Sequence, residues 1–208
     1  MSKQDFWTPT FDISHRDDGA ILIRQPEPLP DYKPTLADYL DHWADTTPDQ
    51  TWIARRGADE AWIKVSYGET RALAQRMGAA LLDLGLGPDR PLLVLSEHSI
   101  EHSLISLACA YVGIPYAPVS PAYSLVSQDY AKLKDIAALL TPGAVFADDG
   151  AAFAPAIASI KASQVISVRN LQPGSLDYAS LAEEADPEGS KAARAALTTE
   201  TTLKYLFT

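Results

Sequence analysis

The sequence predicts an α/β fold with a parallel sheet flanked by helices. From Tyr67 onward, amphipathic helical patterns alternate with short apolar runs, and this alternation is typical of parallel strands joined by helices. Each expected helix is long enough to cross back over a sheet between two parallel strands. With 208 residues and 47% hydrophobic content, the chain can bury a core of this kind.

The expected elements follow one another regularly from residue 67. Helices are expected at residues 67–84, 99–112, 127–140 and 150–161, with a short helix at 178–185. Strands are expected at residues 91–96, 115–118, 144–147, 164–168 and 203–207. Gly113 can end the second helix in the left-handed region, Ser127 can cap the third, and Pro142 with Gly143 ends it. Residues 186–202 predict a solvated loop that could include a helical turn.

Two stretches precede this α/β region of residues 67–208. Residues 1–34 contain five prolines, too many for a regular element, so we expect an extended arm laid over a larger body. Residues 35–66 predict a helix followed by a β-hairpin. Thr35 is the candidate N-cap, and apolar residues at helical spacing continue until Pro48: Leu36, Tyr39, Leu40 and Trp43. Two tryptophan-containing runs flanking residues 57–60 give the hairpin.

The last six residues, Leu203 to Thr208, predict a buried strand that ends without a turn or cap. Ligands of α/β folds bind just beyond the carboxyl ends of such strands. We therefore expect the chain to stop where its chemistry would begin.

Composition excludes several classes of function. The net charge of −10 argues against nucleic acid as a partner, because phosphates demand clustered Lys and Arg. The single cysteine, Cys109, excludes an internal disulfide and favours a reducing compartment, so we expect a cytoplasmic protein. The start has no apolar signal-peptide core, and prolines interrupt the longest apolar stretch, so we expect no membrane span.

One short motif raises a metal hypothesis. His98, Glu101 and His102 match the H-x-x-E-H pattern of inverted zinc peptidases, in which two imidazoles on one helix face bind Zn²⁺. Glu183 or Glu184 could supply a distant third ligand. The opposing interpretation places these residues as ordinary polar side chains at a helix start, and we prefer it because the motif lacks its structural context.

A second candidate follows the strand expected at 115–118. Ser120 and Tyr123 come directly after its carboxyl end, where they could face a substrate cleft. The alternative is that this proline-rich stretch forms a rigid turn that only supports the core. Neither residue has a partner that would make it a nucleophile.

The stretch from Ile100 to Val126 resembles the AMP-forming acyl-CoA ligases, most closely the feruloyl-CoA synthetases. Three further blocks are similar to the same family: residues 67–86, residues 140–150 and residues 204–208. Pro88-Asp89-Arg90 stands where Gly-Asp is more usual. The resemblance runs from about His15 onward but covers only the amino-terminal part of such an enzyme.

The resemblance implies the amino-terminal subdomain of the acyl-CoA ligase fold, incomplete because it ends before the phosphate-binding loop. It implies that Thr208 stands at the threshold of that loop, where its hydroxyl or N–H could touch nucleotide. The cofactors implied for the parent enzyme are ATP, Mg and CoA. No catalytic residue and no metal ligand of the family has a counterpart in residues 1–208.

The implied reaction converts a carboxylic acid, such as ferulate or a related hydroxycinnamate, to its CoA thioester through an acyl-adenylate. We expect residues 1–208 alone to be inactive and to bind none of these cofactors tightly. The alternative is a truncated, non-catalytic folding module, in which exposed apolar surface would favour a homodimer.

Overall fold

The computed structural model describes residues 10–207. The chain divides into two compact units, Met1–Lys33 and Pro34–Thr208. In the described part of the first unit, β1 (Asp12–His15) and β2 (Ile21–Arg24) form an antiparallel hairpin, with Ile13 opposite Ile23. The prediction of no regular element in residues 1–34 is therefore wrong. Pro9 precedes β1 in the sequence and the other four prolines follow β2, so none of them interrupts the hairpin.

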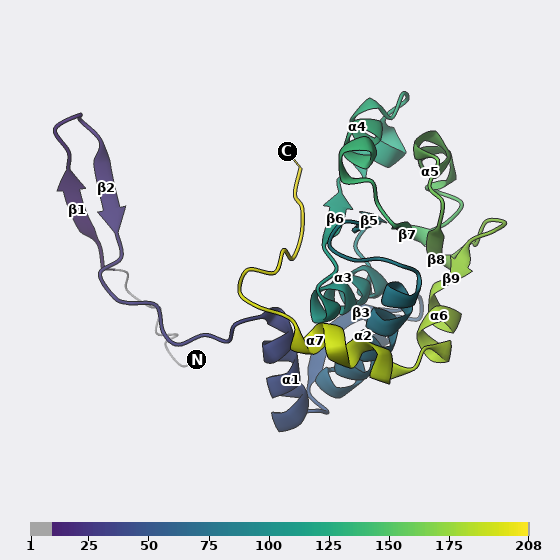
Figure 1. Ribbon diagram of the computed structural model, residues 1–208, viewed down its shortest axis with the longest axis horizontal. Helices are drawn as coiled ribbons and strands as arrows, with labels where there is room; N and C mark the ends of the chain where they lie inside the picture. The colour runs from purple at the N-terminus through teal and green to yellow at the C-terminus, as the bar shows by residue number, and fades with distance from the viewer. Residues whose placement is uncertain (1–9, 208) are drawn as a thin grey trace. The chain divides into compact units, whose positions relative to one another are not determined.

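The second unit is built around a five-stranded sheet in which all neighbouring strands are parallel, in the order β6-β5-β7-β8-β9 (Figure 1). Its strands are β5 (Leu92–Leu95), β6 (Tyr116–Val119), β7 (Ala144–Asp149), β8 (Val165–Arg169) and β9 (Leu176–Asp177). The predicted fold class is confirmed. The very short β9 was not expected from the sequence.

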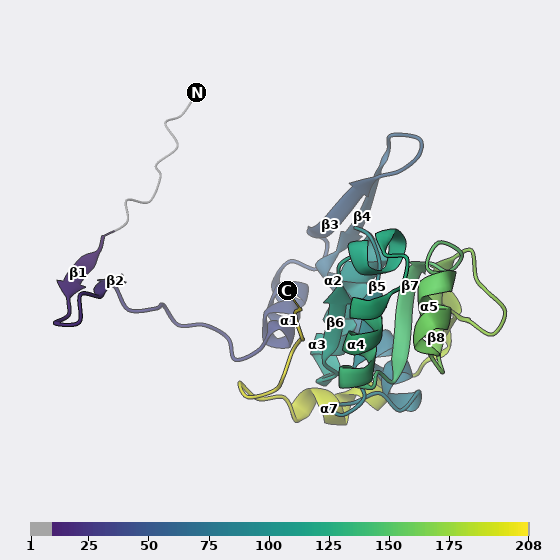
Figure 2. The same ribbon diagram turned by 90° about the horizontal axis from the view of Figure 1, so that it is seen from above.

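Helices cover both faces of this sheet (Figures 1 and 2). The helices α4 (Ala131–Leu140) and α5 (Ala154–Ile160) pack on one face. The other face carries α1 (Leu36–Thr46), α2 (Tyr67–Asp83), α3 (Ile100–Val112) and α6 (Tyr178–Glu184). Alternate residues of the fully buried strand β5 enter the two layers, Leu92 and Val94 on the α2–α3 side and Leu93 and Leu95 on the α4–α5 side.

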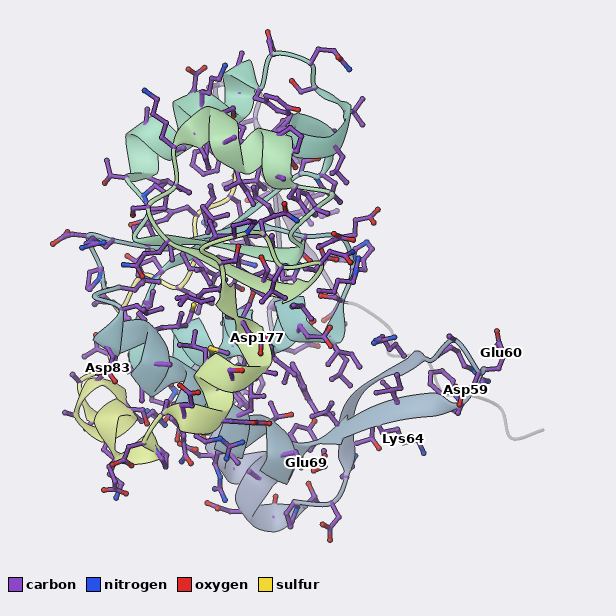
Figure 3. The ribbon with its side chains drawn as sticks, turned by 90° about the vertical axis from the view of Figure 1, so that its right-hand side faces the viewer. Asp59, Glu60, Lys64, Glu69, Asp83 and Asp177 are labelled. Atoms are coloured by element: carbon purple, nitrogen blue, oxygen red, sulfur yellow. The ribbon has the colours of Figure 1, made fainter. Side chains whose placement is uncertain are left out.

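The predicted caps Thr35 and Gly113 are present, and Ser66 and Ser99 are caps that were not predicted from the sequence. Thr35 forms a capping box with Asp38 at the start of α1, and Ser66 forms another with Glu69 at the start of α2. Ser99 caps α3, which ends at Gly113 with a φ of 75°. The predicted hairpin is also present, as β3 (Thr51–Arg56) and β4 (Trp62–Ser66), and Asp59 and Glu60 lie at its tip (Figure 3).

The predicted helix at 127–140 starts later than expected. A short π-helix, η1 (Ala122–Val126), follows β6, and Tyr130 adopts a φ of 54° just before α4. The Ser127 hydroxyl accepts the N–H of Tyr130, so Ser127 closes a turn instead of capping the helix. The helix predicted at 150–161 likewise begins only at Ala154, because the Asp149 carboxylate holds the preceding N–H groups of Ala151 and Ala152 in a turn.

The predicted loop at 186–202 contains a 3₁₀ turn, η2 (Pro187–Ser190), and a short helix, α7 (Lys191–Ala195). Arg194 ties α7 to α1 through Asp38, at 2.5 Å, and Asp41, at 2.9 Å. The loop is therefore fastened to the body of this unit by charged side chains.

The strand predicted at 203–207 does not form. This segment runs beside β6 but makes a single parallel bridge, between Lys204 and Tyr116. Tyr116 donates to the Leu203 carbonyl at 3.3 Å and accepts from Tyr205 at 2.9 Å. The next residue of β6 that faces this side is Pro118, which has no N–H to continue the ladder.

Candidate functional site

The candidate site lies at the carboxyl ends of β5, β6 and β7, where parallel strands deliver the loops of a binding site. A cavity of about 350 Å³ opens there between the loop after β5 and the loop after β6. Its polar lining comes from Ser96, Glu97, His98, His102 and Ser120. The sequence-predicted Ser120 is thus placed beside two histidines from the neighbouring loop and helix.

The β6 loop is held in shape by its own backbone. Tyr123 donates its N–H to the Ser120 carbonyl at 2.9 Å, which closes a turn after the strand. The Ser120 hydroxyl accepts weakly from Ala122 at 3.4 Å. The partly buried side chain of Tyr123 packs against the α4–α5 apolar cluster and does not line this cavity. The structure therefore brings only Ser120 of this predicted pair to the cavity.

The β5 loop places the two histidines differently. Because α3 begins at Ile100 with Ser99 as its N-cap, His98 precedes the helix while His102 lies in its first turn. The Ser99 hydroxyl accepts the His102 N–H at 2.9 Å, and the His102 ring nitrogen Nδ1 lies 3.4 Å from the Glu97 carbonyl oxygen. Burial lowers the pKa of His102, although the hydrogen bond with the Glu97 carbonyl acts in the opposite direction. The lowered pKa favours a neutral imidazole.

This geometry removes the premise of the zinc hypothesis. Two imidazoles share one helix face only when both residues are helical, and His98 is not. Within residues 10–207, no group of three His, Cys, Asp or Glu side chains could hold a metal ion. The H-x-x-E-H pattern is therefore a helix start with ordinary polar residues.

A buried carboxylate that sequence reasoning missed lies at the same edge. Asp148, in β7, is 3% exposed, and its Oδ1 atom has no hydrogen-bond partner within the described residues. Burial raises its pKa, while Arg169 acts in the opposite direction, with a guanidinium nitrogen 3.6 Å from Oδ2. The signal available in the sequence was its position near the carboxyl end of an apolar strand.

The neighbouring Asp149 has a structural role. Its carboxylate accepts N–H groups from Ala151 and Ala152 and is also bound by Asn170 and Arg169. The Ala152 N–H and Asn170 are the main causes of its lowered pKa. The third predicted site residue, Thr208, lies outside the residues that the structure describes.

No helix within residues 10–207 has the length and apolar character needed to cross a membrane.

Comparison with known proteins adds a family and a set of similar folds. The model of a family described as AMP-binding enzyme matches residues 40–208. A probable non-canonical nonribosomal peptide synthetase of Salinispora arenicola is 34% identical over 89 residues, which are 43% of this chain and 1% of that protein. Bacitracin synthase 3 of Bacillus licheniformis is 30% identical over 111 residues, which are 52% of this chain and 2% of that protein.

Three solved structures share the fold. The fatty acyl CoA synthetase of Mycobacterium tuberculosis has a TM-score of 0.65 at 18% identity and is matched over 84% of this chain and 32% of its own. An acyl-CoA synthetase of Brucella canis has a TM-score of 0.62 at 15% identity and is matched over 77% of this chain and 29% of its own. A benzoate CoA ligase of Burkholderia xenovorans has a TM-score of 0.58 at 22% identity and is matched over 74% of this chain and 29% of its own. The chain thus spans about a third of these structures and only 1–2% of the curated relatives.

Proposed function

The chain belongs to the AMP-binding enzyme family, and we propose that it forms the amino-terminal part of an ATP-dependent, AMP-forming acid–thiol ligase. The observation that carries the proposal is the family match over residues 40–208, which includes the whole parallel sheet and the edge where the candidate site lies. The fold is that of the amino-terminal part of adenylate-forming acyl-CoA ligases.

The proposed reaction has two steps. In the first, a carboxylate oxygen of the acid attacks the α-phosphorus of ATP, an acyl–phosphate bond forms, and pyrophosphate leaves with the electron pair of the broken P–O bond. In the second, the sulfur of CoA attacks the acyl carbon and the thioester forms, the C–O bond to AMP breaks, AMP leaves with the electron pair of that bond, and the thiol proton is released. Positioning and neutralisation of phosphate charge supply most of the catalysis in such transfers.

We propose a hydroxycinnamate such as ferulate as the acid. The support is the resemblance of residues 100–126 and 140–150 to the feruloyl-CoA synthetases. We assign Ser120 and Tyr123 to the substrate side of the site, with Ser120 in the cavity wall and Tyr123 holding the turn that presents it. Thr208, by its place after the segment beside β6, is assigned to contact with the nucleotide.

The described residues do not fit a magnesium site. Within residues 10–207, no group of three acidic or other metal-ligating side chains lies close enough together to hold a cation. We therefore derive no step of the reaction through Mg²⁺ from this chain.

A second candidate is an amino-acid-adenylating domain. It is favoured by one observation: the curated relatives at 30–34% identity are peptide synthetases. Both candidates release pyrophosphate from ATP, so they differ in the acid that triggers release and in the thiol that accepts the acyl group.

The test is pyrophosphate release by the complete gene product that contains this chain. The panel would hold ferulate, 4-hydroxycinnamate, benzoate, a fatty acid and the common amino acids. Release with hydroxycinnamates, followed by a CoA thioester, is the expected result. Release with an amino acid alone would favour the second candidate, and no release with any acid would contradict both.

We also propose that residues 1–208 alone release no pyrophosphate and associate weakly with one another through exposed apolar side chains. The support for association is Leu139 and Leu206, which are 74% and 66% exposed beside a groove of about 740 Å³. Light scattering across a concentration series measures association, and a monomer throughout would contradict this part of the proposal.

A further inference from the structure

A second cavity lies at the opposite edge of the sheet from the candidate site. It has a volume of about 600 Å³ and is lined by Arg90 before β5, Ala144 at the start of β7 and Gln164 before β8. The helices α4 and α5 lie on the same face of the sheet (Figure 2). Residues of both helices complete the wall of the cavity. Its volume falls in the range of about 300–1,000 Å³ that is typical of small-molecule sites.

The charge of this cavity differs from that of the chain. The sequence has 27 acidic and 17 basic residues, yet none of the described residues that line the cavity is acidic. Arg90 and Lys161 line it, and neither forms an ion pair within residues 10–207. Lys134 contributes mainly its aliphatic stem, because its ammonium group donates to the Asp129 carbonyl at 2.8 Å.

A buried acceptor without a donor lies in the same wall. The Gln164 amide nitrogen donates to the Leu84 carbonyl at 3.3 Å, and this bond fixes which way the amide points. The Gln164 Oε1 atom then has no hydrogen-bond partner within the described residues, although it is buried. Buried acceptors are nearly always paired, so a donor from outside the chain would fit here.

The rest of the lining is small and mixed in polarity, with three hydroxyl side chains, Thr141, Ser159 and Ser163, beside apolar residues. Ala137, Ala138, Ala144 and Ala162 leave space, and Val145 and Ile160 add apolar surface. The cavity thus combines two unpaired cations, one unpaired acceptor and an apolar wall. A ligand that satisfies all three has an anionic group, an apolar body and a hydrogen-bond donor.

We propose that this cavity binds a small hydroxy acid with an apolar body at a site separate from the one described above. The carboxylate would pair with Arg90 and Lys161, the apolar body would lie on the alanine-rich wall, and the hydroxyl would donate to Gln164 Oε1. The proposal is independent of the proposed function, because it rests on the lining of a different edge of the sheet.

A competing explanation exists for both cations. Lys161 is the C-cap residue of α5, where a positive charge offsets the partial negative charge of the helix end. On that explanation, removing the charge of Lys161 would lower stability and leave binding unaffected. The same explanation applies to Arg90, because one of its guanidinium nitrogens lies 3.7 Å from the position that a Cβ would take at Gly85, directly after the C-cap of α2.

The test uses the full chain with 4-hydroxycinnamate as the probe in isothermal titration calorimetry. The variants are Arg90→Gln and Lys161→Asn, because Asn tolerates the φ of 52° at position 161. The control is Lys132→Gln, an exposed lysine of α4 that does not line the cavity. We expect each cavity variant to raise the dissociation constant about tenfold, which is a loss of about 1.4 kcal/mol of binding free energy. The control should bind with the same dissociation constant as the unmodified chain.

Two further measurements keep the test decisive if a variant unfolds. Cinnamate, which lacks the hydroxyl, should bind the unmodified chain less tightly than 4-hydroxycinnamate, because Gln164 loses its donor. Amide NMR shifts on titration should map to Ala144, Lys161 and Gln164. No binding by the unmodified chain, shifts confined to the Ser96 and Ser120 edge, or unchanged affinity in both folded variants would each overturn the proposal.

Discussion

At the scale of single residues, two adjacent carboxylates at the end of β7 have pKa values shifted in opposite directions. Asp148 is buried with one oxygen unpaired, and burial raises its pKa. Asp149 accepts several hydrogen bonds, and the Ala152 N–H and Asn170 are the main causes of its lowered pKa. The buried carboxylate of Asp148 therefore lowers the stability of the fold at neutral pH. A destabilising buried polar group of this kind is usually kept only where it takes part in a functional site.

Replacing Asp148 with Asn should stabilise the chain at pH 7. A raised pKa in the folded state means that stability is lost as pH rises through that pKa, and the Asn variant escapes this loss. The gain should shrink as pH falls and should vanish well below about 4, where the unmodified carboxyl is protonated in both states. Thermal unfolding midpoints measured across this pH range check the expectation.

Asp149→Asn is the matched control, with the opposite sign. A lowered pKa in the folded state contributes stability above the unfolded pKa, and this stability is lost as pH falls. The variant should therefore be less stable than the unmodified chain at pH 7. Destabilisation by Asp148→Asn at pH 7 would contradict the account of Asp148.

At the scale of elements, α2 and α3 approach each other at a glycine. A Cβ added to Gly78 would lie 2.6 Å from Cγ1 of Val112, closer than real contacts allow. Val112 is buried and has a stiff side chain, so it cannot move aside at low cost. The absence of a side chain at position 78 thus sets how closely the two helices pack.

Gly78→Ala should destabilise the chain by on the order of 1 kcal/mol, because overpacking outweighs the gain in helix propensity. Val112→Ala relieves the clash, so the two substitutions together should be less destabilising than the sum of each alone, by about 1 kcal/mol. Urea unfolding of the four proteins gives this coupling. Additive effects would show that the helices separate without cost.

A second element-scale feature is the attachment of α7 by Arg194. Its guanidinium contacts Asp38 and Asp41 of α1 and lies 5.4 Å from the centre of the Tyr111 ring of α3. Tyr111 in turn donates to Asp41 at 2.9 Å. Three helices distant in sequence therefore meet at one partly buried side chain.

Arg194→Gln should lower the free energy of unfolding by about 1–3 kcal/mol at pH 7, because it leaves two carboxylates without their cation. Burial raises the pKa of Asp38, but hydrogen bonds from Arg194 and Thr35 outweigh it and hold the pKa below its usual value. The difference between variant and unmodified chain should therefore diminish as pH falls below about 4. Lys191→Gln, in an exposed pair with Glu188, is the control and should change stability by less than about 1 kcal/mol.

At the scale of the whole molecule, the elements that the sequence predicts best are the strands that are buried on both faces of the sheet. The continuous apolar run of β5, Leu92 to Leu95, identifies it as a buried strand without knowledge of the strands that pair with it. The segment at 203–207 has an equally apolar pattern, but its pairing depends on the neighbour, and Pro118 of β6 cannot donate. That Ser120 lies at the candidate cavity could be predicted from its place after a strand, whereas the unpaired oxygen of Asp148 arises from packing that the local sequence does not encode.

Stability should also be distributed unevenly between the two units. An isolated two-stranded hairpin is marginal in water, and Ile13, Ile21 and Ile23 of its strands remain more than half exposed. The amides of β5 and β7, by contrast, lie in a sheet covered on both faces. We expect hydrogen exchange at least about a hundredfold faster in the β1–β2 ladder than in β7, because local opening costs little there. Exchange by mass spectrometry measures both regions in one experiment. Equal protection of the two would contradict the expectation and would mean that the hairpin is stabilised by contacts beyond its own ladder.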